Sequence, residues 1–571
     1  MNVRSIRNRA ITLLGNKEFI LLLGVSLLVL IIFLINGKHE KYPDEFDNIL
    51  GGRYLLEGKL IYRDWFTHHG PFPYFLSAAI NIFSNNSFVN FRFIYSIFLF
   101  GLTILSYLFI KRRLKSINIT FYLFFIFLIG IGATYFWGHM LLADSLSGFL
   151  LTPVFALIIL KIINNKKFEL IDFTFISLFS FLTVISSLSY LFLIAGIYTV
   201  LLFYYILQEK RRFNLLEFIK IITVFVIPYI FFLIYLIITG SFSDYIYQAF
   251  IFNKDYYIYY PGLEGKPPSN PLRYAIVILN GFHNNFSSMM ITVRDFNFSF
   301  PFNITLGVVN TVFGIYLLFK RKYLALLFLI GVLVYSNVRS NPFSSRETDY
   351  QSAVYIMISL FNMTYIIPTL YKELNSNIEY AKKLIFSLLF IVLIIYSFFS
   401  FTFLLRKFSY KAYDKYMGFA PRIYDRPLIA PLINQIVPNG KYAWIGPFYF
   451  DELYYLNAKI PSKYHILLPG MGKSDKIPPE ITAEFEKNKP DVIYFNKDHY
   501  ILGANPAEYG KFFMEFLAKN YLLLKDINGG IYSYSASVDP SIIAEQKLYI
   551  KKDKIPEIII KMQENNLITK N

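Results

Sequence analysis

Residues 18–36 read EFILLLGVSLLVLIIFLIN, and the segment at 42–47 reads YPDEFD. The first stretch is apolar over about the length that crosses the roughly 30 Å hydrocarbon layer of a bilayer. The second places adjacent carboxylates, Asp44 and Glu45, where the chain would leave that layer. Acids at the mouth of a membrane-embedded cavity are costly and tend to be kept for chemistry or ion handling. The pair of segments therefore predicts a membrane protein with a polar site at one face.

The composition indicates a chain that crosses the membrane many times. Of 571 residues, 55% are hydrophobic and 16% are charged, against roughly 25% charged in ordinary soluble domains. The net charge of +18 falls in short clusters between apolar runs instead of one stripe, so nucleic-acid binding is not indicated. Cysteine is absent, which excludes disulfides, thiol nucleophiles and cysteine-ligated metal centres. Any chemistry must use carboxylates, histidine, arginine, lysine or hydroxyl groups.

Apolar runs of spanning length begin near residues 18, 90, 119, 146, 170, 190, 217, 302, 323, 352 and 384, which predicts eleven membrane helices. Alternate connections are basic, and the positive-inside rule then places the N-terminus in the cytoplasm and the C-terminus outside. Basic residues precede the first apolar run, as they do in a signal peptide. This run is longer than a typical signal core and lacks a small-residue cleavage site, so a retained helix is expected.

Three segments on the predicted outer side are too long to be turns: 37–90, 240–301 and the tail from about 406. A shorter outer loop covers 336–351. In the first segment, Phe72 to Phe83 is apolar but below spanning length, and prolines at 71 and 73 favour a helix start, so a surface or internal helix is expected. The predicted organisation is a transmembrane domain at 1–405 and an outer domain at 406–571.

The tail has shorter apolar runs with proline and glycine between them, which predicts a small α/β domain. Strands are expected at Tyr442–Ile445 and Val492–Phe495, helices at Asp451–Leu456 and Pro479–Lys487, and a closing hairpin from Tyr521–Lys525 and Gly530–Tyr534.

The first outer segment carries an ordered series of motifs. Asp44-Glu45 is followed by Gly58-Lys59-Leu60-Ile61-Tyr62-Arg63-Asp64 and then by His68-His69-Gly70-Pro71, which leads into the short apolar helix. This order resembles the polytopic GT-C glycosyltransferases, most closely the bacterial relatives of protein O-mannosyltransferases and aminoarabinose transferases. The motifs cover about the first 110 residues, and the many spans and the outer domain extend the resemblance by architecture.

The resemblance implies a polyprenyl-phosphate sugar as donor, with the first-loop acid beside the reacting carbon of the sugar. That acid corresponds to Asp44, with Glu45 next to it. A positioned carboxylate can take the proton of an attacking hydroxyl, so Asp44 is the candidate general base and Glu45 its companion in the catalytic pair. Two solvated loop acids without a catalytic role remain an alternative.

A second acid, Asp144, starts a span on the second outer connection, where many GT-C proteins carry an acid. The resemblance places it in the substrate site, whereas a helix N-cap is the structural alternative. Arg339 and Arg346 lie in a short outer loop against the positive-inside trend. Their planar guanidinium groups suit phosphate, so both are candidates for binding the donor. Pairing with Glu347 or Asp349 is the alternative.

His68 and His69 are candidate substrate-binding residues, or structural residues before Pro71. Adjacent histidines do not form a metal-binding pattern by themselves, so no metal site is predicted, although a divalent cation is compatible with the mechanism. The aromatic run at 256–260 could stack on sugar or lipid, or form part of an interfacial aromatic belt.

The sequence thus predicts a hexosyl- or pentosyltransferase of the bacterial cytoplasmic membrane. It would move a sugar from a polyprenyl-phosphate donor to a lipid, glycan or protein acceptor at the outer face, with membrane lipids and no nucleic acid as further partners. A transporter, flippase or non-enzymatic envelope assembly protein is the alternative. Transport favours ionisable groups deep in the spans, whereas the acids here cluster in outer loops.

Overall fold

The computed structural model describes the chain except for residues 1–16, 40, 86, 115–118, 134, 209–213, 258–300, 337–349, 377–378, 417–426, 502, 530–531, 535–546 and 571. The chain forms two compact units, each made of separate segments. The first contains 1–41, 82–230 and 270–423, and the second contains 42–81, 231–269 and 424–571. The predicted domain boundary near residue 406 stays a prediction.

Within the described residues, a helix occurs at each of the eleven predicted apolar runs: α2 (Lys17–Asn36), α5 (Phe88–Arg113), α6 (Ile119–Gly132), α7 (Ala143–Ile163), α8 (Leu170–Val184), α9 (Leu191–Gln208), α10 (Leu215–Ile238), α13 (Pro301–Phe319), α14 (Tyr323–Tyr335), α15 (Ala353–Leu374) and α16 (Tyr380–Tyr416). Short turns, η1 (Leu188–Tyr190) and η3 (Tyr350–Ser352), precede α9 and α15.

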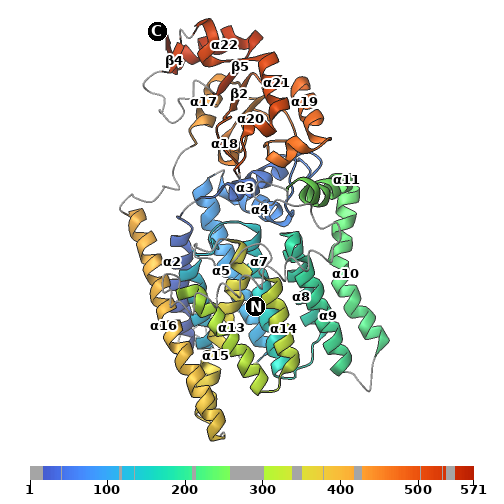
Figure 1. Ribbon diagram of the computed structural model, residues 1–571, viewed down its shortest axis with the longest axis vertical. Coiled ribbons are helices and arrows are strands. Elements are labelled where there is room, and N and C mark those ends of the chain that lie inside the picture. Colours follow the sequence, from blue (N-terminus) through green and yellow to red (C-terminus); the bar gives the residue numbers. More distant parts are fainter. Residues whose placement is uncertain are drawn as a thin grey trace, which may run out of the picture. The chain divides into compact units, whose positions relative to one another are not determined.

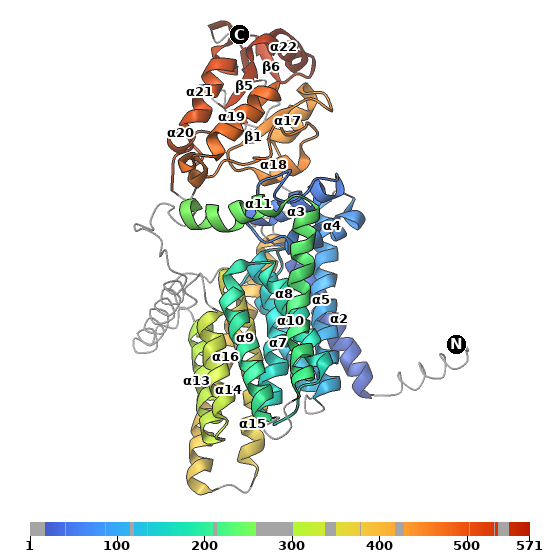
Figure 2. The ribbon, with the colours of Figure 1, turned by 90° about the vertical axis from the view of Figure 1, so that its right-hand side faces the viewer.

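The helices of the first unit lie side by side (Figures 1 and 2). By length and composition, six of the described segments are long and apolar enough to cross a membrane: α5, α7, Leu188–Gln208, α10, Tyr350–Leu374 and Tyr380–Arg406. The prediction of an α-helical polytopic membrane protein is confirmed at this level.

Helix α7 forms the centre of the first unit, since every residue from Asp144 to Ile162 is buried. Helix α16, in contrast, is largely exposed: its residues Leu388, Ile391 and Phe398 are each more than half exposed. Apolar residues on all sides of a helix suit either a protein core or contact with lipid. Polar side chains join two of these helices: Asn310 of α13 donates a hydrogen bond of 2.8 Å to Ser359 Oγ of α15.

Two of the basic residues that predict the orientation also form ion pairs. Asp172, in the first turn of α8, is fully buried and accepts from Arg113 Nε at 2.7 Å and from Lys161 Nζ at 2.5 Å. Arg113 ends α5 and Lys161 lies in the last turn of α7. The C-terminal ends of α5 and α7 therefore lie on the same side of the first unit, as the alternation of basic connections predicts.

The second unit contains α3 (Pro43–Leu56), most of α4 (Phe72–Ser84), the end of α10, α11 (Phe242–Tyr245), the π-helix η2 (Ile246–Tyr257) and the tail. The tail's helices are α17 (Ile429–Ile436), α18 (Phe450–Tyr455), α19 (Ile477–Lys487), α20 (Pro506–Tyr509), α21 (Lys511–Asn520) and α22 (Ile555–Glu564), with 3-10 turns η4 (Pro469–Lys473), η5 (Leu524–Gly529) and η6 (Lys552–Lys554).

The tail forms a four-stranded sheet in the order β1 (Ala443–Gly446), β2 (Val492–Phe495), β5 (Leu548–Lys551), β3 (Tyr521–Leu523). Strands β1 and β2 are parallel and fully buried, as expected for strands covered on both faces. In Figure 2, α19 and α21 lie on one side of this sheet and α17 and α22 on the other. The predicted small α/β domain is confirmed, including both expected strands and both expected helices.

The predicted closing hairpin is wrong. Strand β3 pairs with β5, whereas β4 (Tyr532–Tyr534) pairs with β6 (Ile568–Lys570) in a separate two-stranded sheet. The turn η5 follows β3 directly and redirects the chain. Two short apolar runs joined by a glycine-containing turn favour a hairpin locally, but pairing with distant strands decides the register here.

Candidate functional site

The acid pair opens helix α3 of the second unit. Tyr42 is extended, Pro43 takes the first helical position, and Asp44 and Glu45 follow in the first turn. Carboxylates are favourable there because the unpaired N–H groups give a helix N-terminus a partial positive charge. Glu45 is fully buried, and Asp44 is half-buried. Two solvated loop acids are therefore not what the structure contains, while the catalytic role of the pair stays a prediction.

Asp47, one turn after Asp44 on the same helix, is a buried carboxylate with several polar neighbours. It is 5% exposed. Its Oδ2 accepts a hydrogen bond of 2.7 Å from the hydroxyl of Tyr74 and lies 3.2 Å from His69 Nδ1. Its Oδ1 lies 3.5 Å from His465 Nε2. One buried carboxylate thus faces two imidazoles and a phenol.

These neighbours keep Asp47 ionised. Burial acts to raise the pKa of the Asp47 carboxyl, but the close approach of His465 and His69 outweighs it and holds the pKa well below its ordinary value. A carboxylate with so low a pKa is a weak proton acceptor at neutral pH. Asp47 is therefore suited to orient the two imidazoles and unsuited to serve as a general base.

The loop that carries His68 and His69 is held from several sides. Tyr62 donates to the His69 carbonyl at 2.8 Å, and Asn253 of η2 donates to the His68 carbonyl at 2.9 Å. The His68 ring packs against that of Tyr257, with the centroids 4.3 Å apart. The two histidines therefore lie in a loop that hydrogen bonds and ring packing hold in place. His69 lies beside the Asp47 carboxylate. Among the described residues no group of three or more His, Asp or Glu side chains could hold a metal ion.

The tail contributes His465 to this site. The His465 side chain is 2% exposed, and its backbone carbonyl accepts a hydrogen bond of 3.0 Å from the Trp444 indole. The first loop is tied to the same part of the tail, because the Phe66 N–H donates to the Lys463 carbonyl at 2.8 Å. The backbone hydrogen bond thus connects the loop that carries the histidines to the segment that carries His465.

Several buried polar atoms of the second unit have no hydrogen-bond partner among the described residues, and they include Tyr54 Oη, Trp65 Nε1, Tyr454 Oη and His465 Nδ1. The Tyr54 ring lies edge-on to that of His465, with the centroids 5.8 Å apart. Most buried polar groups in proteins are paired, so the unpaired Tyr54 Oη and His465 Nδ1 on these neighbouring side chains indicate a position for ordered water or a polar ligand.

The Gly51-Gly52 pair allows α4 to approach α3 closely. A Cβ atom at Gly51 would lie 2.3 Å from a ring carbon of Tyr74, and one at Gly52 would lie 2.6 Å from the backbone nitrogen of Ala78. Only glycine fits both positions at this distance. The close approach brings the Tyr74 hydroxyl to Asp47. The need for this close packing explains why both positions are glycine.

Asp144 belongs to the first unit, where it lies in the first turn of α7 and is 1% exposed. The N-cap of that helix is Leu142, so the N-cap alternative for Asp144 does not describe the structure. His39 and His139 are also buried in this unit, with ring centroids 6.2 Å apart. The role of Asp144 in substrate binding stays a prediction.

The remaining candidates cannot be placed. Arg339 and Arg346, and their alternative partners Glu347 and Asp349, lie outside the described residues. Of the aromatic run at 256–260, Tyr256 and Tyr257 end η2, and the other three residues lie outside the described part of the chain.

Sequence reasoning missed Asp47, Tyr74 and His465. Asp47 had a usable signal, because it stands three residues after Asp44 and so shares a face with it once the segment is helical. Tyr74 and His465 gave none, since their proximity to Asp47 arises from tertiary packing.

No protein-family model matches the sequence, and no curated protein matches it. Solved structures that match the chain include two proteins. The archaeal oligosaccharyltransferase AglB from Archaeoglobus fulgidus, in complex with an inhibitory peptide and a dolichol-phosphate, has 12% identity and a TM-score of 0.39, over 95% of this chain and 77% of that one. ArnT from Cupriavidus metallidurans, bound to undecaprenyl phosphate, has 12% identity and a TM-score of 0.43, over 84% of this chain and 93% of that one.

AglB is an oligosaccharyltransferase, and the two structures hold dolichol-phosphate and undecaprenyl phosphate, respectively. With 12% identity and TM-scores below 0.5, the likeness assigns no donor, acceptor or site residue to this chain.

Proposed function

We propose that this chain is a membrane glycosyltransferase that moves a sugar from a polyprenyl-phosphate-linked donor to a hydroxyl acceptor. The observation that carries the proposal is the placement of Asp44 and Glu45 in the first turn of α3, half-buried and buried, one turn before the Asp47 cluster. A half-buried carboxylate beside ordered polar groups is suited to proton transfer, whereas an exposed loop acid is not.

In the proposed reaction, an oxygen of the acceptor hydroxyl attacks the anomeric carbon of the sugar. The new carbon–oxygen bond forms as the bond from that carbon to the phosphate oxygen breaks, and the electron pair leaves with the polyprenyl phosphate. Asp44 takes the proton of the attacking hydroxyl as general base. Buried Glu45 shapes the acidic pocket, so that the acceptor is held close to Asp44.

The other groups bind substrate in this proposal. His69, oriented by Asp47, and His68 hydrogen-bond to donor or acceptor, and Asp144 adds a further acid. Arg339 and Arg346 bind the phosphate, whose charge grows as the bond to the sugar breaks. The reaction as written requires no metal ion, and a divalent cation on the phosphate would be compatible with it.

The finer assignments are also proposals. The basic connections favour a bacterial cytoplasmic membrane protein with its N-terminus inside and the acid site and tail at the outer face. The acceptor would be a lipid, a glycan or a protein of the cell envelope, and the transferred sugar a hexose or a pentose.

The test is transfer of a labelled sugar from polyprenyl-phosphate donors in membranes that contain the wild type or Asp44→Asn. We expect a fall of about 10²–10⁴-fold in rate, the usual contribution of a general base. Glu57→Gln is the matched control, because Glu57 directly follows the same helix, 38% exposed and paired with Arg53. Full activity in a correctly inserted Asp44→Asn protein would contradict the assignment of the base.

The proposed binding of phosphate by the two loop arginines is tested by measuring donor affinity. Arg339→Ala and Arg346→Ala should weaken binding of the labelled donor, and Arg321→Ala, which removes a cation from the short turn after α13, should leave it unchanged. Unchanged donor affinity in both loop variants would remove this role from the two arginines.

A further inference from the structure

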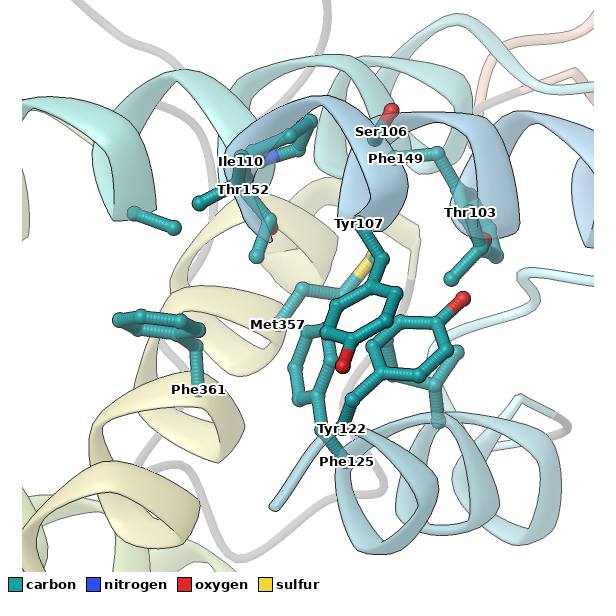
Figure 3. Close-up of a pocket in the computed structure, with 13 residues that line it drawn as sticks. Thr103, Ser106, Tyr107, Ile110, Tyr122, Phe125, Phe149, Thr152, Met357 and Phe361 are labelled. Atoms are coloured by element: carbon teal, nitrogen blue, oxygen red, sulfur yellow. The ribbon is translucent and has the colours of Figure 1, made fainter. Parts of the chain in front are cut away.

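A pocket lies between α5, α6, α7 and α15 of the first unit and outlines about 480 Å³ of partly open space. Its wall is mainly apolar and includes Ile129, Ala156 and Phe361. Figure 3 shows side chains from these helices converging on it. None of the residues proposed above for glycosyl transfer lines this pocket.

Two tyrosines line the pocket, together with the hydroxyl residues Thr103, Ser106 and Thr152. The rings of Tyr107 (α5) and Tyr122 (α6) stack, with centroids 3.5 Å apart, and their side chains enter from opposite helices (Figure 3). The two residues are 5% and 4% exposed. Neither hydroxyl has a hydrogen-bond partner in the described part of the chain, and the same holds for Ser106 Oγ beside them.

Unpaired donors in an apolar wall favour a ligand that brings acceptors. A buried hydroxyl without a partner lowers stability, so a molecule that accepts from both phenols gains more in this pocket than a hydrocarbon of the same shape. The two hydroxyls lie at opposite ends of the stacked rings (Figure 3), and a diacyl glycerolipid provides one ester carbonyl oxygen for each. An isoprenoid chain carries no hydrogen-bond acceptor along its length and would leave the phenols unpaired.

The position of the phenols along α5 agrees with an ester. Tyr107 precedes Lys111, Arg112 and Arg113 by four to six residues, which is a rise of roughly 6–9 Å. Lys111 and Arg112 are exposed, and Lys111 Nζ lies 5.9 Å from the centre of the Tyr107 ring. The headgroup layer on each side of a bilayer is about 5–7 Å thick. With the basic residues at the lipid phosphates, the phenols lie where headgroups meet hydrocarbon, which is the level of the ester carbonyls.

We propose that this pocket binds an anionic diacyl glycerophospholipid. One acyl chain lies along the apolar wall, the two ester carbonyls accept from Tyr107 and Tyr122, one from each phenol, and the phosphate lies near Lys111. The occupant is thus a lipid of the surrounding membrane, distinct in chemistry from the polyprenyl donor. The proposal concerns a different set of residues from the glycosyl-transfer site and does not depend on it.

The first test uses the wild-type full chain in detergent. Binding of phosphatidylglycerol is measured by native mass spectrometry beside its diether analogue, which has the same headgroup and chains of equal length but no carbonyl groups. We expect the diester to bind about tenfold more tightly, equivalent to about 1.4 kcal/mol. Equal affinity for the two lipids would overturn the proposal, and so would displacement of phosphatidylglycerol by an equal concentration of undecaprenyl phosphate.

The second test locates the preference. Tyr107→Phe combined with Tyr122→Phe should abolish the preference for the diester while the stacked rings remain. Tyr204→Phe is the control, because that hydroxyl already donates to the Lys166 carbonyl and lies outside the pocket. A double variant that keeps the wild-type preference would overturn the proposal. If the double variant does not fold, the wild-type comparison of diester with diether decides alone.

Discussion

The hydroxyl of Tyr74 donates a hydrogen bond of 2.7 Å to Oδ2 of Asp47, and this bond joins α4 to α3 in the interior of the second unit. The same hydroxyl lies 2.6 Å from Thr67 Oγ1, so the bond also reaches the loop that carries the histidines. Tyr74 therefore contacts the carboxylate that faces both His69 and His465.

Asp47→Asn should lower the free energy of unfolding by about 1–3 kcal/mol, since it removes the charged acceptor of buried hydrogen bonds. The pKa of Asp47 lies below its ordinary value, so its stabilising contribution is complete above the unfolded-state pKa of about 3.9 and is lost as pH falls through the lower folded-state value. The difference between wild type and variant should therefore persist from about pH 8 down to about pH 4 and shrink only below it.

Thermal unfolding of the two full-length proteins in detergent across this pH range measures that difference. Asp553→Asn is the control, because Asp553 is 64% exposed and its side chain pairs with Lys551 at the surface of the tail. A difference that disappears between about pH 8 and about pH 6 would contradict a permanently ionised Asp47.

Gly51→Ala should displace Tyr74 from Asp47, because the added methyl group would lie 2.3 Å from the Tyr74 ring. Overpacking of this kind costs about 1–3 kcal/mol, and we expect glycosyl transfer to fall together with stability. Gly101→Ala in α5 meets no atom within 4 Å and is the matched control. Unfolding temperature and sugar transfer are measured on the same preparations, and a Gly51→Ala protein equal to Gly101→Ala in both would refute the packing argument.

Glu452 caps a helix from a distance. Its carboxylate accepts from the N–H groups of Leu428, Ile429 and Ala430 at 2.8 to 3.0 Å, at the start of α17. Glu452→Ala leaves those donors unpaired and should cost about 1–2 kcal/mol. Hydrogen exchange of the α17 amides reports the loss, with Glu508→Ala, an exposed acid at the start of α20, as control. Unchanged protection in Glu452→Ala would show that another group pairs with these donors.

The sequence predicted the helical part of the fold well, because an apolar run of spanning length has few alternatives to a helix in a membrane. The strands Val492–Phe495 and Ala443–Gly446 were recognisable as short buried runs for a similar reason. The hairpin at Tyr521 failed, since its strands pair with residues far along the chain and no local pattern records that choice.

The candidate site was predicted in part. The segment containing Asp44, Glu45 and the two histidines does form an ordered helix and loop that are mostly buried. The connection of Asp47 to Tyr74 and His465 could not be predicted, because it depends on how closely α3 and α4 pack at Gly51 and on where the tail folds.

Arg53 Nη1 donates a hydrogen bond of 2.6 Å to the Tyr454 carbonyl and so joins residues that are 401 positions apart. At synthesis rates of about 5–20 residues per second, a ribosome needs roughly 20–80 s to make the intervening chain. During that time α3 exists without the partners that the tail supplies, so the acid cluster is completed only near the end of translation. The order of synthesis thus delays assembly of the site until most of the tail has been made.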